Sequence, residues 1–497
     1  MHLKANVIAA RVGPDSLYGE AAHRVDWYSF VAILSWYTLI VFKPKPMKQL
    51  FILFFTLTLL STGSASAQSI NTRIVKDSLF IPWEILWGPD NNIWLTQKNG
   101  YICRLHPTSG VLDTLYHEPA TVIQSEGGML GMALHPQFAT QPYVYVVYDY
   151  LNSSNVYRER VVRYTYNGSN ALGSPQILLD NVNAAVNHNG SRLLIIGDKL
   201  YITTGDALTM SNAQSNASPN GKIHRINLDG TIPADNPIPG NTLWSKGHRN
   251  PQGMVYANGF LYSSEHGNTT DDEVNIIRKG RNFGWPAVEG FCNTTAEQQF
   301  CTDSNVVEPL YAWTPTLAVC GIDYYGGATP PYTAFTSLAG SLIMCTLKDQ
   351  HLYQLKLNAA KDSIVSAGVI NGVSFGRLRD ICISPQGKIY ISTSNSPSSG
   401  TGALMDRIVE LSDPNATNGV GNLSAQGIRI YPNPARHFLV VEGLKGNASY
   451  RILDLSGRLL HEGQMQVGSG GINVGAMAPG NYLLEIPGIG AQIFSRE

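Results

Sequence analysis

The sequence predicts an all-β protein, and two observations support this fold class. Charged residues make up only 14% of the 497 residues, while Gly occurs 48 times and Tyr 24 times. Short alternating strand patterns also recur along the chain, separated by turn formers and with little helical periodicity, which is typical of β architectures. A chain with 43% hydrophobic residues is too apolar to be disordered as a whole.

One pattern recurs through the first 400 residues: a turn rich in Gly, Pro, Asp or Asn leads into an alternating strand. Its copies lie at 87–97, 195–206, 256–267 and 383–395. Self-similar β units spread along a chain indicate a propeller, in which four-stranded sheets surround a central channel. The stretch from Gln68 to Gly427 allows about 60 residues for each of six blades. We therefore predict a six-bladed β-propeller over 68–412, with a single large sandwich as the alternative.

The composition changes near the C-terminus. Residues 413–427 are rich in Asn, Gly, Ser and Thr, which indicates a linker. Short alternating strands with the turns YPNP and LSGR follow. We predict that residues 428–497 form a small, separate β-sandwich.

An export signal is predicted at residues 47–67. Lys48 supplies the positive charge, residues 50–60 are apolar, and Ala65-Ser66-Ala67 is a small-residue cleavage pattern. The mature protein would then begin at Gln68 and reach an oxidising compartment.

A signal peptide should begin a chain, yet 46 residues precede this one. We interpret residues 1–46 as a misassigned extension before a true start at Met47. The alternative is a double anchor, since residues 27–42 are a second apolar run, slightly short of the roughly 20 residues that a spanning helix needs.

Charge and cysteine content narrow the functional classes. The net charge is −1, which argues against a nucleic-acid partner. Cys292 and Cys301 lie close together in an exported chain, so we expect a disulfide between them. The remaining cysteines are either buried thiols or further bridges: Cys103, Cys320, Cys345 and Cys382.

Three polar segments could carry chemistry on their own. Residues 264–273 crowd carboxylates and carbonyls onto one loop, which suits Ca²⁺ but also suits a solvated turn. His188 could be a general base or a structural histidine. Arg377 and Arg379 share one face if extended, and with Lys348 they could bind an anion with several carboxylates or form a solvated edge.

Seven motifs occur together in one order. They are EGGMLGMALHPQF (126–138), NHNGSRL (187–193), GHRNPQG (247–253), SEHGNTTDDEVN (264–275), NFGWP (282–286), TLKDQHLYQL (346–355) and GRLRDI (376–381). This combination, over about residues 74–411, resembles the soluble pyrroloquinoline quinone (PQQ)-dependent glucose dehydrogenase and aldose sugar dehydrogenase family of six-bladed propellers. The tail resembles the type A cargo domain of the bacterial type IX secretion system, through YPNP, LSGR and GNYLLEI.

The resemblance implies catalytic roles for two residues. His188 would take the proton from the sugar C1 hydroxyl while the C1 hydride passes to the C5 carbon of PQQ. Arg249 would polarise the quinone oxygen and stabilise the charge that develops there.

The resemblance also implies a cofactor site. The carbonyls of Gly267 and Asn268 would bind a Ca²⁺ that acts as a Lewis acid on PQQ. The other residues implied at the cofactor are Glu126, Asn250, Lys348, Arg377 and Arg379.

Several positions depart from the family pattern. Asn187 replaces an Asp, so we expect His188 to lack a nearby anion that would raise its basicity. Glu126 replaces a Gln and adds negative charge near a polyanionic cofactor. Asn268 replaces a Pro and Ser191 a Gly, and together these changes leave the preferred sugar open.

The sequence thus predicts an exported enzyme that oxidises an aldose at C1 to the lactone with PQQ and Ca²⁺. Its partners would be the sugar, a separate electron acceptor and the secretion machinery. The alternatives are a calcium-dependent lactonase-type hydrolase and a non-catalytic carbohydrate-binding propeller. The dehydrogenase is favoured by the three basic residues Lys348, Arg377 and Arg379, together with His188 and Arg249.

Overall fold

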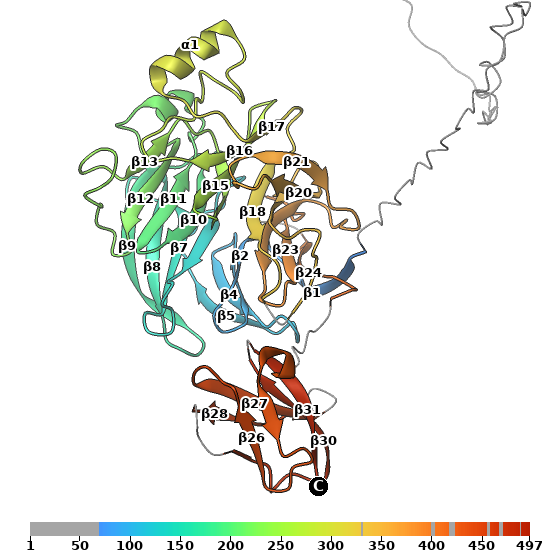
Figure 1. The fold of residues 1–497 in the computed structure, drawn as a ribbon. Coiled ribbons are helices and arrows are strands. Elements are labelled where there is room, and N and C mark those ends of the chain that lie inside the picture. The colour runs from blue at the N-terminus through green and yellow to red at the C-terminus, as the bar shows by residue number, and fades with distance from the viewer. Residues whose placement is uncertain are drawn as a thin grey trace, which may run out of the picture. The chain divides into compact units, whose positions relative to one another are not determined.

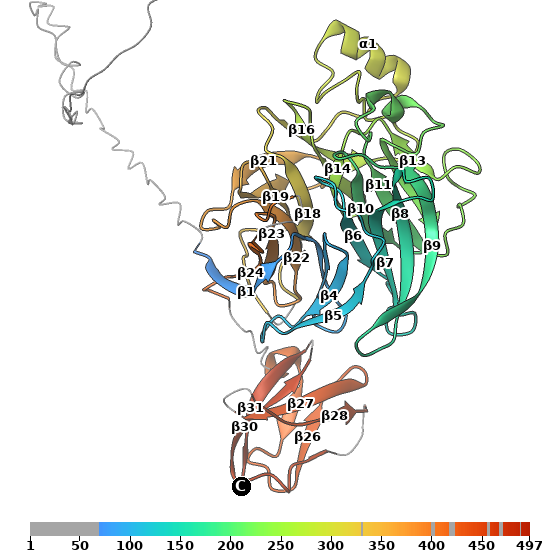
Figure 2. The same cartoon turned by 180° about the vertical axis from the view of Figure 1, so that it is seen from behind.

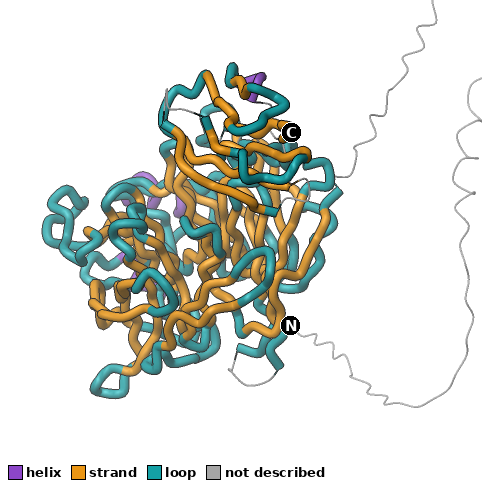
Figure 3. Tube along the Cα trace, turned by 90° about the horizontal axis from the view of Figure 1, so that it is seen from below, coloured by secondary structure: helices purple, strands orange, loops and turns teal. Residues whose placement is uncertain are grey.

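The computed structural model describes residues 69–329, 332–398, 403–416, 423–454, 458–466, 471–487 and 489–497. The predicted extension (1–46) and signal peptide (47–67) lie outside them. Strands dominate the described residues (Figure 3), which confirms the all-β prediction. The helices are α1 (Thr295–Ser304) and two 3₁₀ helices, η1 (Met210–Gln214) and η2 (Leu423–Gln426). No helix in this part of the chain has the length and apolarity needed to cross a bilayer.

Six four-stranded antiparallel sheets follow one another through the described residues up to 412 (Figure 1). The first three comprise β2 (Pro82–Trp87), β3 (Ile93–Gln97), β4 (Tyr101–Leu105) and β5 (Leu112–His117); β6 (Met129–Leu134), β7 (Tyr143–Leu151), β8 (Tyr157–Tyr166) and β9 (Leu172–Asn183); and β10 (Gly190–Ile196), β11 (Lys199–Thr204), β12 (Lys222–Asn227) and β13 (Leu243–Lys246). The next two comprise β14 (Pro251–Ala257), β15 (Phe260–Glu265), β16 (Asp272–Ile277) and β17 (Tyr311–Trp313); and β18 (Val319–Tyr325), β19 (Ser341–Thr346), β20 (Leu352–Leu357) and β21 (Ile364–Val369). The last combines β22 (Leu378–Ile383), β23 (Ile389–Thr393) and β24 (Asp406–Ser412) with β1 (Asn71–Leu79).

The sheets form a closed ring, seen from the two sides in Figures 1 and 2. The first strands contact one another in the order β2, β6, β10, β14, β18 and β22, and β22 contacts β2 again. β1 pairs with β24 from Asn71 opposite Ser412, so the start of the described chain completes the last sheet. The interior strands therefore surround a central channel.

The four repeated sequence patterns are hairpins between the first and second strands of their sheets, as predicted. In the β14–β15 hairpin, Asn258 and Gly259 have φ values of 54° and 83°. Two consecutive positive φ values are characteristic of the type I′ turn that Asn-Gly favours. With all these turns at one end of the ring, the starts of the first strands and the ends of the second strands meet at the other end.

Apolar side chains from neighbouring sheets pack together between them. Trp94 of the first sheet, for example, meets Phe138 and Tyr166 of the second edge to face. Cys292, in the loop before α1, and Cys301, within α1, form the predicted disulfide. The other four cysteines are buried free thiols, which resolves the alternative that the sequence leaves open.

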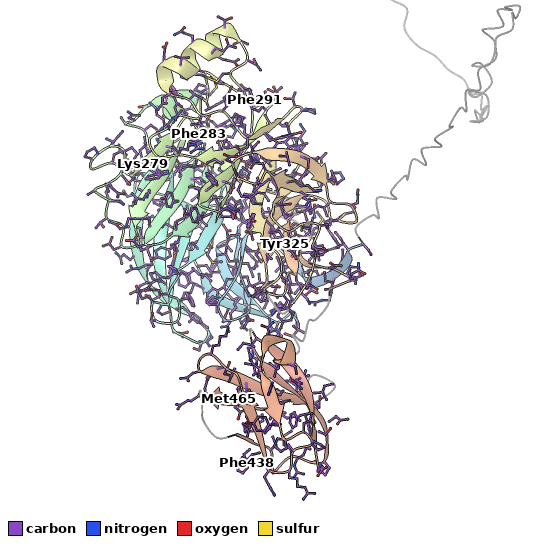
Figure 4. The ribbon with its side chains drawn as sticks, in the orientation of Figure 1. Lys279, Phe283, Phe291, Tyr325, Phe438 and Met465 are labelled. Carbon is purple, nitrogen blue, oxygen red and sulfur yellow. A yellow bond between two sulfur atoms is a disulfide. The ribbon has the colours of Figure 1, made fainter. Side chains whose placement is uncertain are left out.

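The C-terminal residues build two further sheets around their own hydrophobic cluster. One sheet holds β25 (Arg429–Tyr431), β26 (Phe438–Glu442) and β29 (Ile472–Asn473); the other holds β28 (Leu459–Met465), β27 (Ala448–Asp454), β30 (Gly480–Ile486) and β31 (Gly490–Arg496). Leu439, Ile452 and Leu484 are fully buried in the shared cluster. Figure 4 marks Phe438 and Met465 in this part of the chain.

Candidate active site at one end of the ring

The candidate residues gather where the first strands begin and the second strands end. His188 precedes β10, Arg249 precedes β14, and Arg377 precedes β22. Glu265 ends β15, and Asp206 follows β11. The antiparallel hairpins thus bring loops from distant parts of the sequence to one end of the channel.

His188 has a carboxylate partner that sequence reasoning missed. Its Nδ1 lies 2.8 Å from Oδ1 of Asp206, whose side chain is 1% exposed, and the imidazole is 16% exposed. The loss of the Asp at position 187 therefore does not leave His188 without a nearby anion. Asp206, which follows β11, lies at Nδ1 and leaves Nε2 as the nitrogen free to exchange a proton.

Trp285 of the NFGWP motif links this pair to Arg249. The indole Nε1 donates to Oδ2 of Asp206 at 2.9 Å, and the Arg249 guanidinium lies 5.3 Å from the indole centroid. Arg249 also donates to the His266 carbonyl at 3.3 Å. Burial lowers the pKa of Arg249, and neighbouring carboxylates, Asp206 first, oppose that effect.

Glu265 fixes the backbone of the GHRNPQG motif. It accepts hydrogen bonds from the backbone N–H groups of Arg249 and Asn250 and from Nδ1 of His248. The ring of Phe283, labelled in Figure 4, stacks on His248 with 4.7 Å between centroids. Asn250 is fully buried, and its Oδ1 accepts from the Gly190 N–H at 3.1 Å.

Most carboxylates of the acidic loop 264–273 accept hydrogen bonds from other groups of the protein. Asp272 accepts from the N–H groups of Gly267 and Leu317, and Glu273 from that of Gly290. The carbonyl oxygens of Gly267 and Asn268 accept no hydrogen bond within the described part of the chain. These carbonyls, rather than the carboxylates, are the oxygens that remain available to a cation.

Arg377 and Arg379 line a cavity of about 290 Å³ together with Glu126, as their spacing predicts for an extended segment. Arg379 is 6% exposed and donates to Gln252 Oε1 at 2.6 Å, while Arg377 is exposed and donates to the Ser394 carbonyl. Glu126 accepts from the His188 N–H at 3.2 Å, so this cavity adjoins the histidine. A buried lysine, Lys98, also lines this cavity, and no sequence motif marks it.

Lys348 lies apart from this cavity lining. It is exposed on the loop after β19 and donates to Thr316 Oγ1 at 3.0 Å. Thr316 neighbours Leu317, whose N–H binds Asp272. Lys348 therefore stands beside the acidic loop.

A buried ion cluster spans the channel beneath the cavity. Arg192 Nη1 lies 2.6 Å from Glu84 and 3.0 Å from Asp380, and its Nε donates to the Gln252 carbonyl. The side chain of Gln252 holds Arg379. One glutamine thus connects the ion cluster to the cavity floor.

Four buried nitrogens at this end of the ring have no hydrogen-bond partner among the described residues: Asn250 Nδ2, Arg249 Nε, His266 Nε2 and Arg379 Nε. Unpaired buried donors are costly, so such groups normally meet an acceptor. Together with the cationic cavity, they fit a planar, oxygen-rich, polyanionic cofactor such as PQQ. The available carbonyls of Gly267 and Asn268 fit a hard cation such as Ca²⁺.

The chain is similar to known proteins in both of its parts. Residues 79–405 match the glucose/sorbosone dehydrogenase family, and residues 429–496 match the secretion system C-terminal sorting domain. Quinoprotein glucose dehydrogenase B of Acinetobacter calcoaceticus is 30% identical over 421 residues, covering 67% of this chain and 87% of that protein. An aldose sugar dehydrogenase of Escherichia coli K12 is 27% identical over 365 residues, covering 69% and 96%. The PQQ-bound structure of aldose sugar dehydrogenase from Streptomyces coelicolor superimposes with a TM-score of 0.60 at 28% identity, covering 70% of this chain and 98% of that one.

Proposed function

Because this chain belongs to the glucose/sorbosone dehydrogenase family, we propose that it oxidises an aldose at C1 to the lactone, using PQQ and Ca²⁺. Its C-terminal sorting domain indicates type IX secretion to the cell surface or outside. We further propose that the six sheets over 68–412 are six propeller blades, joined through the linker 413–427 to a β-sandwich at 428–497. Residues 47–67 would be the signal peptide.

The observation that carries the proposal is the unbalanced charge of the cavity. Lys98, Arg377 and Arg379 line it, and none of them has a carboxylate within 4 Å among the described residues. Buried cations are normally paired, as Arg192 is with Glu84 and Asp380. A ligand with several carboxylates would supply the missing charge. PQQ is such a ligand.

His188 is the proposed general base. With Nδ1 held by Asp206, Nε2 would accept the proton of the sugar C1 hydroxyl. The resulting imidazolium would face a carboxylate that is already hydrogen-bonded to it. Asp206 would thereby orient the ring and stabilise its charged form.

Arg249 is the proposed electrophilic group. Its guanidinium is held over Trp285 and against the His266 carbonyl, so its position is set before any ligand binds. Fixed donors of this kind stabilise charge that develops on an oxygen. Asn250 would direct its unpaired Nδ2 to the same ligand. When bound, PQQ supplies the two-electron acceptor that no side chain provides.

The remaining proposed contacts concern Ca²⁺ and the anionic groups of the cofactor. Gly267 and Asn268 would bind the cation through their carbonyls, and Arg377 and Arg379 would hold carboxylates. Lys348 would also bind an anionic group of the cofactor, from its exposed loop beside the cation site. Glu126 would lie between the cofactor and the sugar, near His188.

The lactonase alternative would use channel carboxylates as metal ligands. Glu84 and Asp380 are instead bound to Arg192, an arrangement that favours the dehydrogenase. A product assay separates the two activities. We expect the protein, supplied with PQQ, Ca²⁺, glucose and a redox dye, to form gluconolactone in step with dye reduction. Hydrolysis of added lactone without sugar oxidation would contradict the proposal.

A further inference from the structure

Lys98 is held rigidly in the cavity wall. It follows β3 directly and is 2% exposed. Its N–H donates to the Ile81 carbonyl at 3.1 Å, and its own carbonyl accepts from Met129 at 2.9 Å. A Cβ at Gly128 would lie 2.6 Å from the Lys98 Cγ, so glycine is needed there for the lysine chain to pass. The ammonium is thereby directed to one place.

The ammonium of Lys98 has unused hydrogen-bonding capacity. It donates to the Ser125 carbonyl and, at 3.3 Å, to the Ser398 carbonyl. A lysine ammonium has three N–H donors, and no third acceptor is found among the residues that the structure describes. Lys222, which is also buried, donates three hydrogen bonds, to the carbonyls of Asn212, Ala213 and Asn220.

The charge of Lys98 is also unbalanced. Burial, and next Arg379, lower the pKa of Lys98 to about 8, while Glu126 and Asp149 act in the opposite direction. Neither of these carboxylates is within ion-pair distance of the ammonium. Arg377 adds a further positive charge on the cavity wall. The surroundings of Lys98 therefore favour an incoming anion.

We propose that Lys98 binds a carboxylate of PQQ, as an anchoring residue that acts from the end of β3 in the first sheet together with Arg377 and Arg379 at the start of β22 in the last. The inference rests on the proposed function, because it assigns a cofactor contact. With Lys98 included, the positive charges that line the cavity come from both sheets that meet where the ring closes, the first and the last. It would strengthen binding by charge-assisted hydrogen bonding.

The inference predicts a particular pH dependence. The free ammonium loses its proton as the pH rises through about 8, and an anion binds only the protonated form with the added strength. PQQ affinity should therefore be constant below pH 7 and fall above pH 8. At pH 9 the protonated fraction of Lys98 is about one tenth, so affinity should drop about tenfold.

Equilibrium dialysis of PQQ against the full, Ca²⁺-containing protein tests this without relying on activity. We expect Lys98→Met to weaken binding about 10- to 100-fold at pH 6.5 and to abolish the further loss at pH 9. Lys98→Arg, which keeps the charge at both pH values, should bind at pH 6.5 and also lose the pH dependence. Equal affinity of Lys98→Met and wild type at pH 6.5 would overturn the inference.

Two controls keep the outcomes distinct. Lys361→Met removes a lysine that also donates to a carbonyl, that of Gly340, but lies outside the cavity lining, and it should bind PQQ as wild type does. Should Lys98→Met fail to fold, the wild-type pH profile decides, since unchanged affinity from pH 6.5 to 9 contradicts the role of Lys98. Failure of wild type itself to bind PQQ would instead refute the proposed function.

Discussion

At His188, one hydrogen bond determines which nitrogen can act. Nδ1 faces Asp206 at 2.8 Å, so Nε2 remains for the substrate. We expect His188→Ala to lower kcat about 10²- to 10⁴-fold, the usual contribution of a general base, while PQQ remains bound. Steady-state dye reduction and equilibrium dialysis measure the two quantities. Wild-type turnover in the variant would show that the base is another group.

Individual site residues were predictable to different degrees. His188, Arg249 and the Arg377–Arg379 pair stand in recognisable motifs, and the cavity lining confirms that the two arginines share a face. Asp206 was missed because it lies just after β11 in a segment of ordinary composition, and only the β10–β11 hairpin brings it to His188. Lys98 was also missed, because nothing in its own segment marks it as buried.

Among the elements, the first strands of three sheets meet at one buried ion cluster. Arg192 of β10 lies between Glu84 of β2 and Asp380 of β22, and burial raises the pKa of both carboxyl groups against the opposing effect of the arginine. Gln252 of β14 links Arg192 to Arg379, because its carbonyl accepts from Arg192 and its side chain accepts from Arg379. The cluster therefore ties the ring together beneath the cofactor cavity.

Replacing Arg192, the cation at the centre of this cluster, should lower the stability of the fold. We expect Arg192→Met to lower the free energy of unfolding by about 3–5 kcal/mol at neutral pH, because two buried carboxylates lose their partner. Urea unfolding measures the change. The same substitution in a Glu84→Gln, Asp380→Asn background should cost much less. Equal losses in both backgrounds would mean that Arg192 acts through packing and not through charge.

Sequence patterns located four of the six first hairpins and missed those of the second and fifth sheets. The β6–β7 connection (135–142) lacks the repeated turn pattern, and many residues separate the end of β18 at Tyr325 from the start of β19 at Ser341. Turn chemistry reveals tight hairpins, whereas longer connections carry no comparable local signal.

At the scale of the whole molecule, ring closure creates the site. β1 completes the last sheet by pairing with β24, and β2 meets β22 across the same junction. Lys98 and Arg379 thereby face one cavity although they belong to the first and last sheets. Such long-range pairing cannot be deduced from local periodicity, which is why the sequence predicted a ring but not the complete cationic wall.

Reconstitution of the purified protein is the most direct measurement of the central claim. The apoprotein is mixed with a panel of aldoses and a redox dye, with PQQ and Ca²⁺ added separately or together. We predict that dye reduction requires both additions, because the charged cavity fits a polyanion and the carbonyls of Gly267 and Asn268 fit a cation. Sugar oxidation that proceeds equally well without PQQ, or its absence for every aldose despite bound PQQ, would contradict the account.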